Sequence, residues 1–126
     1  MSRIDIALDF DGTCVTHAYP KIGKDIGAFP VLKKLQDRGH RIFLWTMRSG
    51  KELRQAIDFV TENGINLAGA NVNPEQKSWT SSPKLHCQLV IDDIALGIPL
   101  LMDHATNHPY VDWKRVEVLL KQKGLI

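Results

Sequence analysis

Short apolar runs alternate along the chain with segments in which apolar residues recur at helical spacing. Apolar runs of this length are typical of strands that are buried on both faces, as in parallel sheets. We expect strands at residues 4–8, 41–46, 65–70 and 88–92, and a short fifth strand near 98–101. The strand–helix–strand–helix–strand order indicates parallel crossover connections. It predicts a three-layer, Rossmann-like α/β fold with a central parallel sheet flanked by helices.

Three segments carry residues that commonly start or end helices. One helix is expected to begin near Pro30, a residue favoured at the first helical position, and to end before Gly39, which suits a left-handed cap. A second is expected after Ser49, because Ser49 and Glu52 have the spacing of a capping box. Asp112 is expected to cap the last helix.

Length and composition describe an ordinary soluble protein. The 126 residues suit one domain, residues 1–126, with 44% hydrophobic and 24% charged residues. A net charge of +2 gives no reason to expect a nucleic-acid partner. No apolar run is long enough to span a membrane, and acidic residues near the N-terminus argue against a signal peptide. With two cysteines, too few for a disulfide framework, we expect a cytoplasmic protein.

Acidic and hydroxyl side chains follow the predicted strands, where ligands of parallel α/β sheets bind. They are Asp9, Asp11, Thr46, Asp92 and Asp93. Side chains two residues apart on a strand share a side, so Asp9 and Asp11 could project into one cleft with the later pair. Four carboxylates repel one another unless protons or a cation offset their charge. An all-oxygen, strongly negative ligand set suits Mg²⁺ better than Zn²⁺ or copper. The Asp-x-Asp tripeptide alone is more often a solvated turn.

With its neighbours, this pattern resembles the haloacid dehalogenase-like superfamily, most of whose members are Mg²⁺-dependent phosphatases. The first motif of that superfamily corresponds to Asp9-Phe-Asp-Gly-Thr13, and the second to Thr46 after a hydrophobic strand. The third motif is a lysine, here Lys84, and the fourth is an acidic pair, here Asp92-Asp93. The resemblance covers residues 4–99 with the motifs in the right order.

The resemblance implies a role for each matching residue. Asp9 would be the nucleophile that forms an aspartyl-phosphate, and Asp11 would protonate the leaving alcohol and then take a proton from water. Lys84 would neutralise the phosphate and restrain Asp9. Phosphate would be bound by Thr46, Met47, Arg48 and Lys84. Mg²⁺ would be held by Asp9, Asp11, Asp92 and Asp93, with either member of the last pair as the direct ligand.

Two departures from the superfamily pattern leave alternatives open. Many relatives have a glycine before the acidic residue of the fourth motif, whereas this chain has Ile91, which resembles the Asp-Asp subtype. Lys77 competes with Lys84 for the third motif. Lys84 is favoured because it lies just before the strand that ends in the acidic pair.

Segment lengths indicate that the chain has no cap domain. Only residues 14–25 separate the first motif from the first helix, and the Asn71–Pro83 loop is too short for a folded cap. The site should therefore be open and admit a bulky phosphorylated substrate, unless a homo-oligomer covers it. We expect residues 14–24 and 71–83 to form its rim.

Several other side chains allow more than one interpretation. Trp45 and Trp113 are expected in the core, whereas Trp79 either packs or stacks on a base or sugar ring. Arg48 either binds phosphate as a bidentate donor or is a solvated charge in the first helical turn. Cys14 is expected to be a packed thiol rather than a redox sensor. Surface or capping roles are expected for the histidines.

The leading functional prediction is a phosphomonoester hydrolase. The alternative is a phosphate-binding or phosphoaspartate regulatory domain without turnover, since receiver domains also combine acidic residues, a threonine and a lysine on a parallel sheet. In receivers, however, the acidic pair comes first in the chain, whereas here it comes last.

Overall fold

The core of the protein is a four-stranded parallel sheet. The computed structural model describes residues 2–126. The strands are β1 (Asp5–Leu8), β2 (Arg41–Leu44), β3 (Leu67–Ala70) and β4 (Leu89–Ile91). Their order across the sheet is β3-β2-β1-β4, with every neighbouring pair parallel. The predicted α/β class and the four predicted sheet strands are confirmed.

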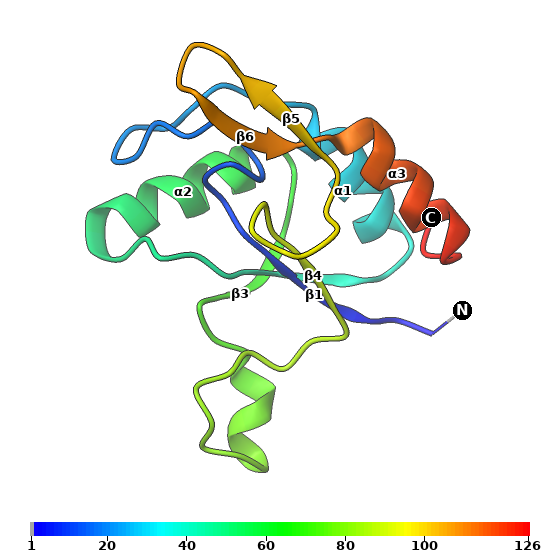
Figure 1. Cartoon of the computed structure of the whole chain (residues 1–126). Coiled ribbons are helices and arrows are strands. Elements are labelled where there is room, and N and C mark those ends of the chain that lie inside the picture. Colours follow the sequence, from blue (N-terminus) through cyan, green and yellow to red (C-terminus); the bar gives the residue numbers. More distant parts are fainter. Residues whose placement is uncertain (1) are drawn as a thin grey trace.

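Three α-helices cover one face of this sheet (Figure 1). They are α1 (Ala28–Asp37), α2 (Gly50–Glu62) and α3 (Trp113–Gln122). One continuous apolar cluster joins them to alternate residues of the central strands, such as Ile6 and Leu8 of β1 and Ile42 and Leu44 of β2. Each of these four side chains is buried, as expected for strands that are covered by helices.

The opposite face is covered by an irregular segment rather than by a helical layer. There Ala7 and Phe43 pack against Leu85, which follows the short 3₁₀-helix η1 (Pro74–Ser78). In Figure 1 this segment lies on the side of the sheet away from α1, α2 and α3. The predicted central parallel sheet flanked by helices is confirmed, but the three-layer arrangement is not, because the β3–β4 connection contains only this 3₁₀ turn and polar loops.

The predicted fifth strand exists but does not join the sheet. It is β5 (Leu100–Asp103), which pairs antiparallel with β6 (His108–Val111) in a separate hairpin. The sequence pattern does not predict β6, because Pro109 lies within it and proline argues against a strand. The hairpin is tied to the loop after β1, because the Val111 N–H donates to the Gly12 carbonyl at 2.9 Å.

The helix ends match the sequence only in part. Gly39 adopts φ +89° just after α1, as predicted, but α1 begins at Ala28 rather than at Pro30. Asp112 caps α3 by accepting from the Arg115 N–H at 3.4 Å. Ser49 precedes α2 but makes no side-chain cap, so the predicted capping box is not formed.

The order of the strands places a switch point next to β1. The chain runs from β1 outward through β2 and β3, and then returns to add β4 on the other side of β1. Ligands of open parallel sheets bind outside the carboxyl ends of the strands at such a reversal. Asp9 follows β1, and Asp92 and Asp93 follow β4, so these residues flank the switch point. Within residues 2–126, no helix has both the length and the apolar character to cross a membrane.

A hydrogen bond from α3 holds the loop that carries the first motif. Trp113 is buried, and its indole Nε1–H donates to the Thr13 carbonyl at 2.7 Å. Trp113→Phe leaves this buried carbonyl without its donor and removes indole volume. We expect it to lower the free energy of unfolding by about 1–3 kcal/mol. Urea unfolding measures the loss. Trp79→Phe, at an exposed position, is the control; equal stability of the two variants would contradict the tether.

Candidate functional site

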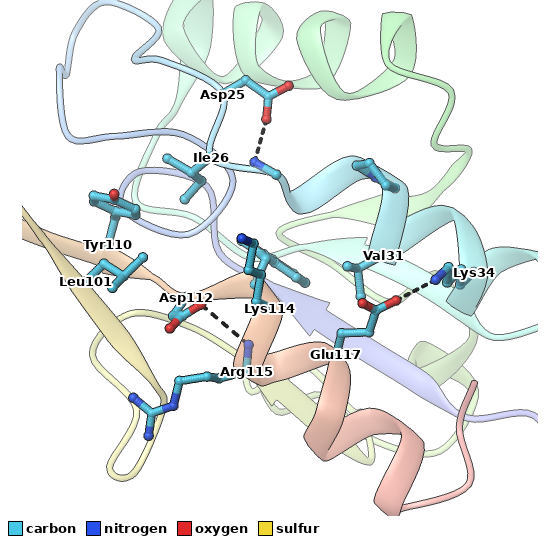
Figure 2. Close-up of a pocket in the computed structure, with 13 residues that line it drawn as sticks. Asp25, Ile26, Val31, Lys34, Leu101, Tyr110, Asp112, Lys114, Arg115 and Glu117 are labelled. Atoms are coloured by element: carbon cyan, nitrogen blue, oxygen red, sulfur yellow. Dashed lines mark hydrogen bonds and ion pairs between the residues drawn. The ribbon is translucent and has the colours of Figure 1, made fainter.

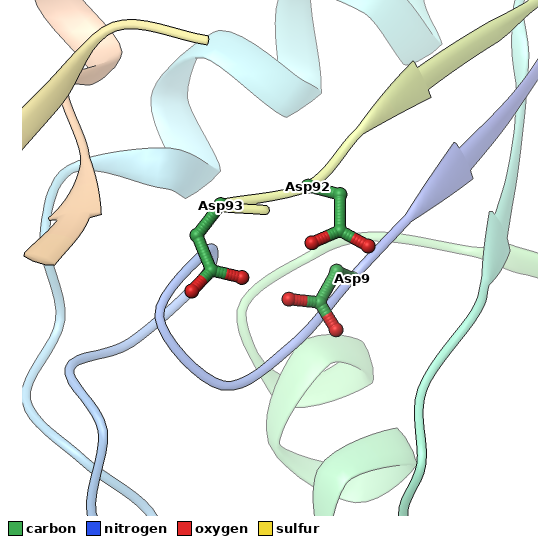
Figure 3. A group of neighbouring side chains, drawn as sticks. All are labelled: Asp9, Asp92 and Asp93. Carbon is green, nitrogen blue, oxygen red and sulfur yellow. The ribbon is translucent and has the colours of Figure 1, made fainter. Parts of the chain in front are cut away.

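Three carboxylates converge at the switch point (Figure 3). One oxygen from each of Asp9, Asp92 and Asp93 lies within 4.8 Å of the others. Asp9 comes from the residue after β1, and the other two come from the turn after β4. Because β1 and β4 are paired in parallel, with Leu8 opposite Ile91, the residues that follow them emerge side by side. The sequence prediction that these three side chains share a site is confirmed.

A buried threonine joins the two acidic segments. The Thr13 hydroxyl donates to Asp9 Oδ2 at 2.8 Å and accepts from the Asp93 N–H at 3.0 Å. The backbone continues the same link, since the Asp9 N–H donates to the Ile91 carbonyl at 3.0 Å. Thr13 is completely buried. The threonine of the first motif therefore fixes the position of Asp9 relative to Asp93.

The glycine of the first motif leaves space for a histidine. Gly12 adopts φ +79°, and an added Cβ would lie 2.6 Å from Asp93 Oδ2 and would collide with the His17 imidazole. His17 Nε2 pairs with Asp93 Oδ2 at 2.9 Å, and its ring packs against that of His108, with centroids 5.1 Å apart. The expectation of surface or capping roles for the histidines is wrong for His17. No spacing signal in the sequence marks it, because its partner is 76 residues away.

The charges of the cluster are unbalanced. Burial, together with Asp92 and Asp93, raises the pKa of Asp9 to about 8. Burial also raises the pKa of Asp92. For Asp93, burial acts in the same direction, but hydrogen bonds with Asp9 and His17 outweigh it and lower the pKa. Without a bound cation, a proton on Asp9 therefore reduces the electrostatic repulsion among the three carboxylates.

The fourth acidic residue, Asp11, is held apart from this cluster by Arg48. The Arg48 guanidinium donates to both oxygens of Asp11, each at 2.8 Å. Arg48 is 1% exposed and also donates to the carbonyls of Pro20 and Lys21. Neither sequence interpretation of Arg48 is right: it is neither solvated nor free to bind phosphate. Its buried position depends on contacts with residues 27–37 positions away, which its own segment does not reveal.

The segment after β2 is held by Asn71, which no motif in the sequence marks. Asn71, in the left-handed region at φ +58°, accepts from the Thr46 N–H at 2.8 Å. Its amide donates to the Arg48 carbonyl at 3.3 Å. The Arg48 N–H in turn donates to the Thr46 hydroxyl oxygen at 3.1 Å. The Met47 N–H makes no hydrogen bond within residues 2–126, so it remains available as a donor.

An open cavity of about 620 Å³ contains these groups. Its walls carry Asp9, Asp11, His17, Trp45, Thr46, Met47, Asn71, Pro83, Asp92, Asp93 and Ile94. Trp45 is 36% exposed here, so its predicted core position is wrong, whereas Trp113 is in the core as predicted. Neither Lys84 nor Lys77 lines the cavity; both are exposed on the segment around η1. Lys84 contributes its carbonyl to Gln76 instead, which the spacing before β4 could not reveal.

A larger cavity, of about 780 Å³, lies between α1, α3 and the hairpin (Figure 2). Several of its charged side chains are already engaged: Lys34 pairs with Glu117, Asp112 caps α3, and Asp25 accepts from the Gly27 N–H. The three-carboxylate cluster lies in the smaller cavity, so the smaller one is the better candidate for chemistry.

The cysteine of the first loop is inert. Cys14 is completely buried, and its thiol donates to the Asp9 carbonyl at 3.4 Å. Burial raises the pKa of this thiol, which keeps it protonated. It is the packed thiol that the sequence predicts.

The fold and the acidic cluster define a Rossmann-like α/β protein with a candidate metal site at its switch point. No family model and no curated protein matches the chain. A solved structure of a conserved protein from Bacteroides thetaiotaomicron is similar to it, with 38% sequence identity and a TM-score of 0.79. The match covers 97% of this chain and 93% of that one. The chain belongs to the same family as that conserved protein.

Removing Arg48 should be costly because it leaves a charged partner unpaired. Arg48→Met is expected to lower the free energy of unfolding by about 3–5 kcal/mol, as when a buried ion pair loses one member. The double variant Arg48→Met/Asp11→Asn should recover part of that loss. Chemical denaturation measures both, with Arg54→Met on exposed α2 surface as the control. A loss below about 1 kcal/mol would contradict a structural ion pair.

The raised pKa of Asp9 predicts a pH-dependent stability. Asp9 ionises near pH 8 in the folded protein and near its ordinary value of 3.8 in the unfolded chain, so the folded state holds the extra proton between these values. Without divalent cations, its contribution to stability should be fully present below pH 3.8 and lost as the pH rises through 8.

Asp9→Asn keeps the shape of the side chain and removes this titration. Its thermal midpoint should therefore rise relative to that of the wild type as the pH increases toward 8, measured in a chelator. Adding Mg²⁺ at high pH should stabilise the wild type and leave Asp9→Asn nearly unchanged. Parallel pH profiles for the two proteins would mean that the cluster is not strained by its charge.

Proposed function

We propose that the protein is a Mg²⁺-dependent phosphomonoester hydrolase of the haloacid dehalogenase-like superfamily, acting through an aspartyl-phosphate on Asp9. The observation that carries the proposal is the convergence of Asp9, Asp92 and Asp93 at the switch point of a parallel sheet. The first-motif residues Gly12 and Thr13 support it, since one makes room for this cluster and the other links its two halves.

The donor set fits the metal. Three carboxylates within 4.8 Å supply oxygen ligands only, which is the chemistry that Mg²⁺ prefers. Burial and the neighbouring carboxylates Asp92 and Asp93 raise the pKa of Asp9 to about 8, and a bound cation would offset this negative charge. Asp9, Asp92 and Asp93 would hold the ion, together with the backbone of Asp11. Bound there, Mg²⁺ would supply the charge that offsets these carboxylates and the phosphoryl oxygens.

The chain's own groups would divide the reaction into two displacements. In the first, an Asp9 oxygen bonds to phosphorus as the bond to the alcohol oxygen breaks, and the alcohol leaves with a proton from Asp11. In the second, a water oxygen attacks phosphorus and gives its proton to Asp11 as the bond between phosphorus and the Asp9 oxygen breaks, which restores the Asp9 carboxylate and yields inorganic phosphate. The Thr46 hydroxyl and the Met47 N–H would bind the phosphoryl oxygens, since both residues line the cavity.

Two observations favour the non-hydrolytic alternative, a phosphate-binding or phosphoaspartate regulatory domain. Both oxygens of Asp11 accept from Arg48, so proton transfer at Asp11 requires one of those bonds to open. No lysine lines the cavity among residues 2–126. A protein with these features could form a phosphoaspartate and release it slowly.

Hydrolysis of 4-nitrophenyl phosphate and of a panel of phosphometabolites separates these functions. We expect phosphate release that requires Mg²⁺ and falls at least about a thousandfold in Asp9→Asn, because the nucleophile is lost. Asp58→Asn, an exposed carboxylate on α2, is the matched control and should match the wild type.

The outcomes are distinct. Asp9-dependent labelling of the protein without turnover would identify the regulatory domain. Neither labelling nor release with any substrate would leave the acidic cluster as a binding site and overturn the proposal.

A further inference from the structure

The acidic cluster lies beneath a rim of exposed apolar side chains. Met47 is 99% exposed, Ile94 86% and Trp45 36%, and all three line the same cavity as Asp9, Asp92 and Asp93. Pro83 extends the rim from the segment before β4. Large apolar groups left in water forgo the free energy of burial, so several of them at the mouth of one cavity indicate a binding surface.

The rim lies on both sides of the proposed nucleophile. Trp45 and Met47 belong to the segment after β2, and Ile94 belongs to the turn after β4. Strands β2 and β4 are the two neighbours of β1, which Asp9 follows. When the phosphoryl group of a substrate lies at Asp9, the rest of that substrate would therefore lie between Trp45 and Met47 on one side and Ile94 on the other.

The cavity offers little to a second anionic group. Arg48 is engaged by Asp11, and His17 is engaged by Asp93. Lys84 and Lys77 lie outside the cavity. A diphosphate, a bisphosphate or a carboxylated substrate would bring extra negative charge to walls that already carry four aspartates.

We infer that the substrate is a phosphomonoester with a single phosphate and an uncharged, apolar, planar alcohol or phenol as leaving group, bound by Trp45, Met47 and Ile94. This inference rests on the proposed hydrolase function. Trp45 supplies a flat surface for stacking, and Met47 supplies a flexible side chain that adapts to the shape of the ligand. The occupant of the apolar rim is thus the leaving group of the reaction at Asp9.

Three aryl phosphates with similar leaving-group acidity test this inference: phenyl phosphate, 2-naphthyl phosphate and 4-carboxyphenyl phosphate. Their chemical steps should be similar, so differences in kcat/KM report the contacts of the leaving group. In the wild type with Mg²⁺, we expect the naphthyl ester to exceed the phenyl ester by about tenfold, since a larger aromatic surface is bound. The carboxylated ester should fall below the phenyl ester.

Variants of the rim residues test whether these side chains cause the preference for the naphthyl ester. Met47→Ser changes a side chain that is fully exposed, so folding should not suffer, and Trp45→Ala removes the stacking surface. Each should lower the naphthyl-to-phenyl ratio by roughly three- to tenfold. Trp79→Ala is the matched control, because Trp79 is exposed but does not line this cavity; its ratio should equal that of the wild type.

Each failure has its own signature. If none of the three esters is hydrolysed in an Asp9-dependent reaction, the proposed function fails, and this inference fails with it. If all three are hydrolysed with equal kcat/KM, or Trp45→Ala and Met47→Ser leave the ratio unchanged, the hydrolase stands and the inference is wrong. If sedimentation shows that Met47→Ser dissociates a wild-type dimer without changing the ratio, the rim is an interface between copies and the inference is likewise overturned.

Discussion

Mutual repulsion among three carboxylates is the constraint on which the rest of the site depends. Oxygens of Asp9, Asp92 and Asp93 lie within 4.8 Å of one another, and the pKa of Asp9 rises to about 8 as a result of burial and of its neighbours. Such a cluster persists only if the fold holds it. The parallel pairing of β1 with β4 sets the two acidic segments side by side, and the Thr13 hydroxyl bonds to both. The Trp113 indole holds the Thr13 carbonyl from α3. The folding free energy of the core therefore keeps the three carboxylates close together at the strand ends despite their mutual repulsion.

Arg48 shows how the same fold keeps the fourth carboxylate apart. Its guanidinium is buried between the rings of Phe10 and Tyr19, at 5.0 and 5.2 Å from their centroids, and it engages both oxygens of Asp11. A buried arginine with one carboxylate satisfies its charge locally, and the carbonyls of Pro20 and Lys21 use its remaining donors. The loop after the first motif, the segment after β2 and Asp11 are therefore one connected unit. A movement of that loop would therefore shift Arg48 and, with it, Asp11.

The sequence predicts the part of this arrangement that local patterns determine. Apolar runs locate the four sheet strands, and the rule that ligands bind at strand ends brings Asp9, Asp92 and Asp93 together. What it misses depends on distant contacts. His17 reaches Asp93 across 76 residues, and the guanidinium of Arg48 reaches Asp11 across 37. Lys84 has a suitable position in the sequence, but the η1 segment folds over the opposite face of the sheet and leaves its side chain exposed. The absence of an α-helix between β3 and β4 also depends on contacts between distant residues. The polar β3–β4 connection covers its face of the sheet with only a few apolar contacts, such as that of Leu85.

The open cavity combines an acidic floor with apolar side chains around it. With Arg48 and His17 both paired to aspartates, the cavity has no uncommitted cationic side chain within residues 2–126. An anionic ligand such as a phosphate ester would be attracted to this cavity only after a cation had bound to Asp9, Asp92 and Asp93. Its remaining contacts would come from Trp45, Met47 and Ile94, whose attraction does not depend on charge and is little affected by salt. Affinity at this site therefore divides into two physically separate parts, an electrostatic part that depends on the cation and an apolar part that the rim supplies.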